Sequence, residues 1–265
     1  MAASGKKRLL IEQIRRQGSM LISYSGGVDS TLLAALARET LGGRTRCILL
    51  DSPVVPRAAV AQARQIAVDL GLDLEVIAVP LTEHEEFCSN PADRCYHCKK
   101  ISAVILRKRA EELGLACIAD GINLSDTHEH RPGLQASTEA GILHPFIDIG
   151  CTKQDIRDIA RECGLPVWQK PSAACLSSRI PYGERITGEK LRIIEEAEDF
   201  LAEQGFGQLR VRLHGNIARI EVHKEEMRRI LEVQQAIVKK IGSLGVSYVT
   251  LDLAGYRSGS MDEVL

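Results

Sequence analysis

The chain is poor in aromatic residues and has no excess of charge of either sign. Aromatic residues make up 4% of its 265 residues, and 34 basic residues are balanced by 35 acidic ones, for a net charge of −1. A general nucleic-acid coat needs a large cationic excess, and a platform for single strands needs aromatic side chains on which bases stack. We therefore expect no nucleic-acid partner.

The sequence also lacks a long apolar run. No segment approaches the roughly 20 apolar residues of a membrane helix, and residues 1–7 are small and polar, unlike the apolar core of a secretory signal. Hydrophobic residues still form 45% of the chain, which is a normal globular share. We expect a cytoplasmic protein with no membrane partner, whose eight cysteines stay reduced and form no disulfide scaffold.

Short apolar segments alternate with helical ones over the first 165 residues. Strands are expected at 19–24, 47–50, 74–79, 115–120 and 142–145, with helices between them that include 98–113 and 153–163. This alternation is typical of βαβ units and a parallel sheet. Beyond Pro166 the pattern becomes helix 189–204, strands 208–213 and 217–223, helix 224–241 and strand 247–253. The sequence thus predicts an α/β domain over residues 1–168 and a smaller α+β domain over residues 169–265.

A glycine-containing loop joins the first expected strand to the helix after it. Residues 25–30 read Ser-Gly-Gly-Val-Asp-Ser. Adjacent glycines let the backbone approach a phosphate, and the start of a helix favours anions. The loop is neither a Walker A loop nor a Gly-x-Gly-x-x-Gly loop, and the alternative interpretation is a glycine turn with an aspartate cap. The expected nucleotide-binding residues here are Ser25, Gly26, Gly27, Asp29 and Ser30, and Asp29 is also expected to orient the loop or hold Mg²⁺.

Polar residues follow two other expected strands. Ser52 comes just after the second strand, and Gly121, Asn123 and Asp126 come just after the fourth. Open α/β sheets bind ligands at the carboxyl ends of their strands. We therefore add these four residues to the nucleotide site, although each segment alone is also compatible with an ordinary turn.

Three cysteines call for an explanation beyond packing. Cys95 and Cys98 form a Cys-x-x-Cys pair, and Cys175 lies in a small, polar, turn-rich segment at 170–183. A structural zinc site would need a second pair, a thioredoxin-like motif would follow the first strand, and a chance pair of buried thiols is a further alternative. Three thiolates are enough to hold a [4Fe-4S] cluster with one iron open. Zinc bound by the three cysteines and His97 is the competing chemistry.

These motifs resemble the LarE family of the PP-loop ATP pyrophosphatase superfamily. The resemblance covers nearly the whole chain and is carried by segments 25–30, 51–53, 93–99, 120–123, 131–133, 171–183 and 251–259. The family makes part of a nickel-pincer nucleotide cofactor. It uses ATP to adenylylate a carboxylate of pyridinium-3,5-biscarboxylic acid mononucleotide, releases pyrophosphate, and replaces oxygen by sulfur to give a thiocarboxylate.

The resemblance also implies how sulfur is supplied. In some members the cysteine matching Cys175 gives up its own sulfur, and those members lack the cysteines matching Cys95 and Cys98. In others, three cysteines hold a [4Fe-4S] cluster that carries an extra sulfide. Because all three positions are cysteines here, the chain is similar to the cluster type, with Cys95, Cys98 and Cys175 as ligands, Cys175 and Asp29 in catalytic roles, and sulfide or another sulfur donor as co-substrate. The family also suggests a homo-oligomer.

The implied substrate carries a phosphate, so cationic groups are expected around it. Ser178 and Arg179 follow Cys175 closely, and Arg212 lies on an expected strand where it shares a face with Arg210 and His214. Arginine suits bidentate phosphate binding. We predict that Ser178, Arg179 and Arg212 bind the substrate phosphate; the alternative is a solvated strand face with routine charges.

Three other functions share some of these features. A transfer-RNA thiolase also joins a PP-loop to a cluster, but it normally carries RNA-binding or zinc-ribbon elements. An amidotransferase-type synthetase shares the loop but needs none of the three cysteines. An ATP-binding regulatory module with structural zinc is the non-enzymatic alternative.

Overall fold

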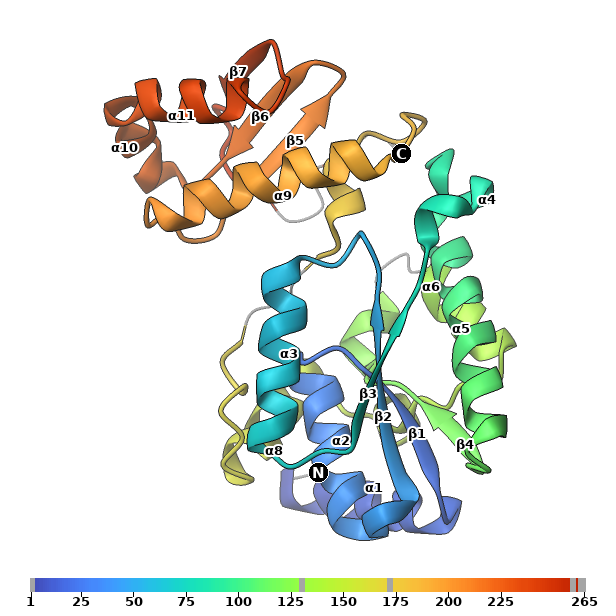
Figure 1. Ribbon diagram of the computed structural model, residues 1–265. Helices are drawn as coiled ribbons and strands as arrows, with labels where there is room; N and C mark the ends of the chain where they lie inside the picture. The colour runs from blue at the N-terminus through green and yellow to red at the C-terminus, as the bar shows by residue number, and fades with distance from the viewer. Residues whose placement is uncertain (1–2, 129–131, 171–173, 258–260, 262–265) are drawn as a thin grey trace. The chain divides into compact units, whose positions relative to one another are not determined.

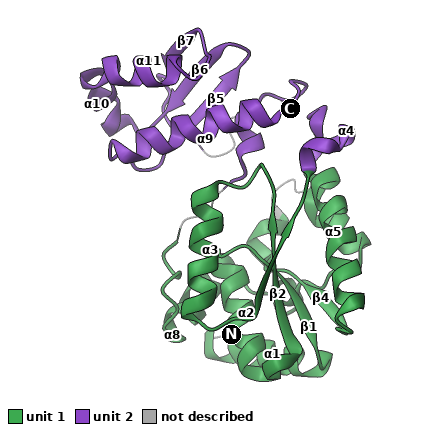
Figure 2. Cartoon of the chain, in the orientation of Figure 1, with its two compact units in different colours: residues 1–80, 95–173 green, residues 81–94, 174–265 purple. Residues whose placement is uncertain are grey.

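The computed structural model describes residues 3–128, 132–170, 174–257 and 261 (Figure 1). Parts of the segments 131–133, 171–183 and 251–259, which carry the family resemblance, lie outside the described residues. The chain divides into two compact units, one of residues 1–80 and 95–173 and the other of residues 81–94 and 174–265 (Figure 2). Within the described ranges, no helix combines the length and the apolar character needed to cross a membrane.

A four-stranded parallel sheet forms the centre of the first unit, as the sequence predicts. Its strands are β1 (Met20–Tyr24), β2 (Thr45–Asp51), β3 (Leu74–Ala78) and β4 (Cys117–Ala119), in the order β3-β2-β1-β4. The expected fifth strand at 142–145 is wrong. Leu143 forms only an isolated parallel bridge with Ala119, and Pro145, which has no N–H for a ladder, begins helix α7.

Helices cover both faces of this sheet. They are α1 (Ala3–Gln17), α2 (Val28–Leu41), α3 (Arg57–Asp69), α5 (Arg94–Glu112), α6 (Pro132–Glu139), α7 (Pro145–Asp148) and α8 (Lys153–Glu162), with short 3₁₀ helices η1 (Gly42–Arg44) and η3 (Leu124–His128). Alternate residues of a strand face opposite sides. Ile22 therefore packs in the cluster with α1, α2 and α8, whereas Leu21 packs with Leu106 of α5 on the other face (Figure 1).

The second unit has a small mixed sheet. Strands β5 (Arg210–His214) and β6 (Ile217–Glu221) form an antiparallel hairpin, and β7 (Tyr248–Leu251) pairs parallel to β6. Its helices are α4 (Glu85–Cys88), α9 (Gly188–Glu203), α10 (Met227–Glu232) and α11 (Gln234–Gly242), with 3₁₀ helices η2 (Leu81–Glu83), η4 (Leu176–Arg179) and η5 (Lys224–Glu226). The single helix expected at 224–241 is wrong, because the chain leaves helical geometry at Val233 (φ −108°, ψ 15°).

Residues 81–94 follow β3 in the sequence and end at the first residue of α5, but they belong to the second unit (Figure 2). The division expected at residue 168 placed them in the first domain. The backbone carbonyl of Cys88 accepts a hydrogen bond from the N–H of Ile186 (2.8 Å), and the carbonyl of Asn90 accepts one from Gly183 (2.9 Å). These bonds attach residues 81–94 to the chain that precedes α9.

Candidate functional site

The loop after β1 is held by its own serines. The Ser25 N–H donates to Ser30 Oγ (3.1 Å), the two hydroxyl oxygens lie 3.1 Å apart, and Ser30 Oγ donates to the Gly27 carbonyl (3.3 Å). Gly26 has φ +70°, and a Cβ there would lie 2.6 Å from the Cβ of Ala63. Only glycine fits this position, because both the backbone conformation and the neighbouring α3 exclude a side chain.

The start of α2 has no side-chain cap. Gly27 is the residue before the helix, and the first N–H groups of any α-helix have no partner within it. Gly121 lies against this turn, since a Cβ there would be 2.8 Å from the Ser30 nitrogen and 3.0 Å from the Asp29 Cβ. The loop after β4 thus reaches the positive end of the α2 dipole, where phosphate groups bind.

Asp29 is the centre of the polar contacts at this edge. Its Oδ2 pairs with Lys153 Nζ, and its Oδ1 accepts a hydrogen bond from Asn123 Nδ2 (3.2 Å). The same amide donates to Asp126 Oδ2 (2.8 Å), and Asn123 Oδ1 accepts from the Ser125 N–H (2.9 Å). The structure therefore brings together the residues predicted from the loop and from the fourth strand end.

Two lysines at the loop are not among the residues predicted from the sequence. Lys153 is the first residue of α8, where a positive charge opposes the helix dipole; this was the available signal. Lys170 donates from Nζ to the Gly26 carbonyl (2.9 Å), and burial lowers its pKa. No local pattern marks Lys170, because only the tertiary fold brings it to the loop.

The loop after β2 is closed by an arginine. Arg57 of α3 donates from Nη2 to the Ser52 and Val55 carbonyls (both 2.7 Å) and from Nη1 to Asp51 Oδ1 (2.5 Å). Ser52 is buried. Since β1 and β2 are adjacent and parallel, this loop lies at the same edge of the sheet as the loop after β1.

A buried acid–imidazole pair follows β4. Asp120 Oδ1 and His144 Nδ1 lie 2.8 Å apart, and His144 Nε2 lies 3.1 Å from Thr138 Oγ1. Asp120 Oδ2 is buried and has no hydrogen-bond partner among the described residues. From the sequence, only residues after Asp120 are expected in the nucleotide site. Because Gly121 contacts the start of α2, this pair supports the backbone of the nucleotide site.

Cys95 and Cys98 lie in the first unit, within the first five residues of α5. The helix begins at Arg94 rather than at the expected residue 98, so both cysteines are helical. Residues three apart share one face of a helix. Cys95 is exposed and Cys98 is partly buried. Helix α6 packs closely here, since a Cβ on Gly133 would lie 3.5 Å from the Cys95 carbonyl oxygen.

Cys175 belongs to the second unit and sits at the start of η4. Its Sγ lies 3.0 Å from Ser177 Oγ, and its carbonyl accepts hydrogen bonds from Ser178 Oγ (2.9 Å) and Arg179 Nη1 (2.8 Å). The thiol is partly buried, while the backbone around it is tightly held. This combination suits a reactive or ligating thiol on a fixed turn.

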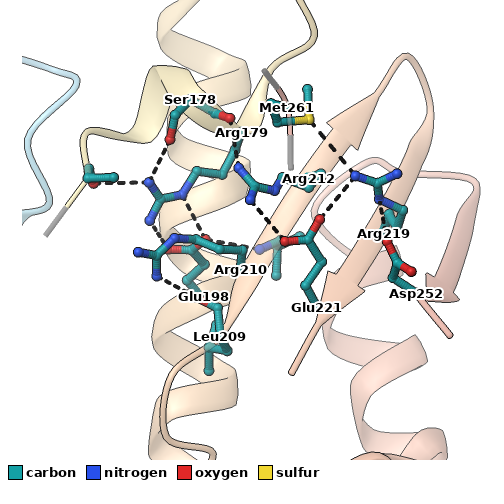
Figure 3. A network of polar contacts seen from close by, with 12 residues as sticks. Ser178, Arg179, Glu198, Leu209, Arg210, Arg212, Arg219, Glu221, Asp252 and Met261 are labelled. Carbon is teal, nitrogen blue, oxygen red and sulfur yellow. Dashed lines mark hydrogen bonds and ion pairs between the residues drawn. The ribbon is translucent and has the colours of Figure 1, made fainter. Parts of the chain in front are cut away.

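Four arginines converge beside this turn (Figure 3). Arg179 forms a two-point ion pair with Glu198 (3.0 and 2.9 Å), and Arg212 donates to the Ser178 carbonyl and to Glu221 (both 2.9 Å). The third is Arg219, which also pairs with Glu221 (3.0 Å).

The fourth arginine gives the cluster its electrostatic character. Burial first, and the nearby positive charge of Arg179 second, lower the pKa of Arg210. Its guanidinium lies over the ring of Tyr256, 5.4 Å from the centroid. A bound anion would offset the second of these causes, the repulsion between Arg210 and Arg179.

The predicted phosphate ligands have protein partners in this structure. Arg179 and Arg212 are 2% and 4% exposed, so each is buried with its guanidinium engaged by carboxylates and carbonyls. Ser178 is partly buried beside them. Direct contact of Arg179 and Arg212 with a substrate phosphate stays a prediction, whereas their binding of the Cys175 turn is observed.

The proposed metal ligands are not grouped in the described residues. Across residues 3–128, 132–170, 174–257 and 261, no three His, Cys, Asp or Glu side chains are grouped to hold a metal ion. Cys95 and Cys98 belong to one unit and Cys175 to the other. Cysteine thiolates are nevertheless the donors by which iron–sulfur clusters are held.

Comparison with known proteins identifies relatives along almost the full length. No family model matches the chain. It is 39% identical to an uncharacterised protein of Synechocystis, over 92% of each chain. It is 32% identical to the pyridinium-3,5-bisthiocarboxylic acid mononucleotide synthase of Lactiplantibacillus plantarum, over 98% of this chain and 95% of that protein.

More distant relatives support the fold of the first unit. The glutamine-hydrolysing GMP synthase of Aeropyrum pernix is 25% identical over 74% of this chain and 42% of its own length. Such enzymes carry a PP-loop, which agrees with the parallel sheet and the loop after β1. With nearly complete coverage by the synthase from Lactiplantibacillus, the chain belongs to the LarE family, the pyridinium-3,5-bisthiocarboxylic acid mononucleotide synthases.

Proposed function

We propose that this enzyme uses ATP to convert a carboxylate of pyridinium-3,5-biscarboxylic acid mononucleotide into a thiocarboxylate. The observation that carries the proposal is the 32% identity over 98% of the chain to a synthase of the bisthiocarboxylic product. The nucleotide loop and the arginine cluster supply the two kinds of anion-binding chemistry that such a reaction needs.

The first step is adenylylation. A substrate carboxylate oxygen attacks the α-phosphorus of ATP, the bond to the β-phosphate bridging oxygen breaks, and pyrophosphate leaves. The N–H groups at the start of α2, with Lys153 and Lys170, stabilise the negative charge on the departing pyrophosphate. Asp29 and Asp126 are the carboxylates at this edge that fit Mg²⁺, a cation that prefers oxygen ligands.

The substrate phosphate is assigned to the second unit. Ser178 has a hydroxyl on a partly buried turn, and Arg210 is only half-buried beside Arg179 and Arg212. An incoming phosphate would relieve the mutual repulsion of these guanidiniums. In this proposal Arg212 and Arg179 contribute positive charge and fix the Ser178 turn, with direct contacts formed when the phosphate binds.

Sulfur replaces the activated oxygen in the second step. We assign Cys95, Cys98 and Cys175 as ligands of a [4Fe-4S] cluster, because all three are cysteines and thiolates are soft ligands that suit iron–sulfur clusters. Bound in this way, the cluster would supply an iron without a protein ligand to which sulfide can attach. Displacement of AMP from the acyl carbon by sulfide then gives the thiocarboxylate, and Cys175 keeps its sulfur.

Anaerobic incubation with ATP, sulfide and the pyridinium dicarboxylate mononucleotide tests the proposal. Mass spectrometry is expected to show AMP, pyrophosphate and a product in which one oxygen is replaced by sulfur, with the protein mass unchanged over several turnovers. Failure to form AMP would reject the activation step. Loss of hydrogen sulfide from Cys175, with one sulfur transferred per chain, would replace the cluster by a sacrificial mechanism. Zinc without iron in the purified protein would favour a structural metal instead.

A further inference from the structure

Asn90 is a buried polar residue in an unusual backbone conformation. Its φ is +54°, and it is the one non-glycine residue with positive φ in the described part of the chain. Its side-chain Nδ2 donates to the carbonyls of Ile180 (3.3 Å), Pro181 (2.7 Å) and Glu184 (3.0 Å). Asparagine adopts left-handed geometry more readily than other side chains, and such a residue persists where its surroundings over-determine it.

Arg94 completes the same set of contacts. It is 4% exposed, donates from Nη1 to Asn90 Oδ1 (2.9 Å), and stacks over the ring of Tyr182, 4.3 Å from the centroid. The Asn90 carbonyl accepts a hydrogen bond from the Gly183 N–H (2.9 Å). We call Asn90, Arg94 and Tyr182 the hub. All of these contacts lie within the second unit.

The position of the hub in the sequence suggests its role. Arg94 is bonded directly to Cys95, so the residue that the hub fixes is the one that leads into the cysteine pair. Ile180 directly follows η4, whose Arg179 binds the Cys175 carbonyl (2.8 Å). The hub therefore joins the chain that enters one cysteine segment to the chain that leaves the other.

We propose that Asn90 and Arg94 are positioning residues for the sulfur-handling thiols. They hold the backbone before Cys95 against the backbone after Cys175, so that the two cysteine segments, far apart in sequence, act on the same ligand. The proposal rests on the assignment of these cysteines to one sulfur-handling site. In the proposed role, neither Asn90 nor Arg94 touches the reacting atoms.

An Asn90→Asp variant tests the role, because it keeps the shape and the acceptor for Arg94 but removes the donor to three carbonyls. Asn216→Asp, at an exposed turn of the same unit, is the matched control. The first readout is the rate at which a short bis-maleimide joins Cys95 or Cys98 to Cys175 in the metal-free protein, with the linked peptides identified by mass spectrometry. The second is iron and labile sulfide per chain after anaerobic reconstitution.

We expect Asn90→Asp to lower both the linking rate and the iron content roughly tenfold, as the loss of a buried hydrogen bond shifts a conformational equilibrium by about that factor, while Asn216→Asp leaves both unchanged. ATP binding should persist in Asn90→Asp, because the nucleotide loop belongs to the other unit. Wild-type linking and iron content in Asn90→Asp would overturn the proposal. If Asn90→Asp loses cooperative unfolding, the milder Tyr182→Leu decides by the same two readouts.

These readouts separate the inference from the proposed function. A wild-type protein that links its cysteines readily but holds no iron would reject the cluster and leave the positioning role standing. A wild-type protein that holds iron, beside an Asn90→Asp variant that holds as much, would reject the positioning role alone.

Discussion

The ammonium of Lys153 is paired with the carboxylate of Asp29, a residue 124 positions away in the sequence. Asp29 lies in the first turn of α2, where anionic phosphates are expected to bind. A carboxylate beside a phosphate is repulsive unless a cation offsets it. Lys153 supplies that cation, so the pair keeps the loop able to accept an anion.

Replacing Lys153 by Met should weaken ATP binding about tenfold to a hundredfold, since a hydrogen bond between charged groups contributes about 1.5–3 kcal/mol. Isothermal titration with ATP and Mg²⁺ measures the change. Lys108→Met on α5, an exposed lysine of the same unit, is the control and should bind ATP normally. Equal affinities for the two variants would show that the Lys153–Asp29 pair does not control anion binding at this loop.

The Arg179–Glu198 ion pair predicts a stability effect in the second unit. Removing Arg179 leaves Glu198 in a setting where its side chain is 14% exposed, and breaking one partner of a buried pair costs about 3–5 kcal/mol. Arg179→Met should therefore lower the free energy of unfolding of this unit, measured by urea denaturation. The double variant Arg179→Met/Glu198→Gln should recover a large part of the loss. If the single variant unfolds like the wild type, the pair is not the anchor of the Cys175 turn.

The features that could be predicted from the sequence are those formed by residues close together in the chain. The loop at 25–30 was recognised because its glycines and serines stand together after an apolar strand. Lys170 was not, because it reaches the Gly26 carbonyl from 144 residues away. The strand expected at 142–145 fails since Pro145 cannot donate to a ladder.

The placement of residues 81–94 in the second unit could not be predicted from the local sequence pattern either. The contacts that attach them include the hydrogen bonds of the Asn90 side chain to carbonyls about 90 residues away. For a similar reason the sequence predicted arginines near a phosphate but not their partners. That Arg179 meets Glu198 follows from the packing of η4 on α9, which no periodicity encodes.

Replacing Gly26 by Ala should reduce stability in two ways, through a steric clash and through backbone strain. In Gly26→Ala the new Cβ would lie 2.6 Å from the Cβ of Ala63, and φ +70° is strained for alanine. Thermal unfolding should show a loss of about 1–3 kcal/mol, typical of overpacking, together with weaker ATP binding. Gly26→Ala/Ala63→Gly should restore only part of the steric loss, because the Cα at position 63 would still lie 2.7 Å from the new Cβ. No recovery in the double variant would mean that the Ala63 methyl group does not contribute to the loss.

The free energy of unfolding at low pH should depend on Asp155, which forms a capping box with Thr152 at the start of α8. Burial raises the pKa of this carboxyl, but hydrogen bonds from Lys6 and Thr152 outweigh it and lower the pKa to about 2. A carboxyl whose pKa is lower in the folded state stabilises the fold above its unfolded pKa, 3.8, and loses this contribution as pH falls to about 2. Asp155→Asn should cost about 2 kcal/mol at pH 7 and much less near pH 2, by urea denaturation at both pH values. Asp158→Asn, at a partly exposed carboxylate one turn further along the same helix, is the control. A cost for Asp155→Asn that is the same at both pH values would show that its charge does not stabilise the α8 terminus.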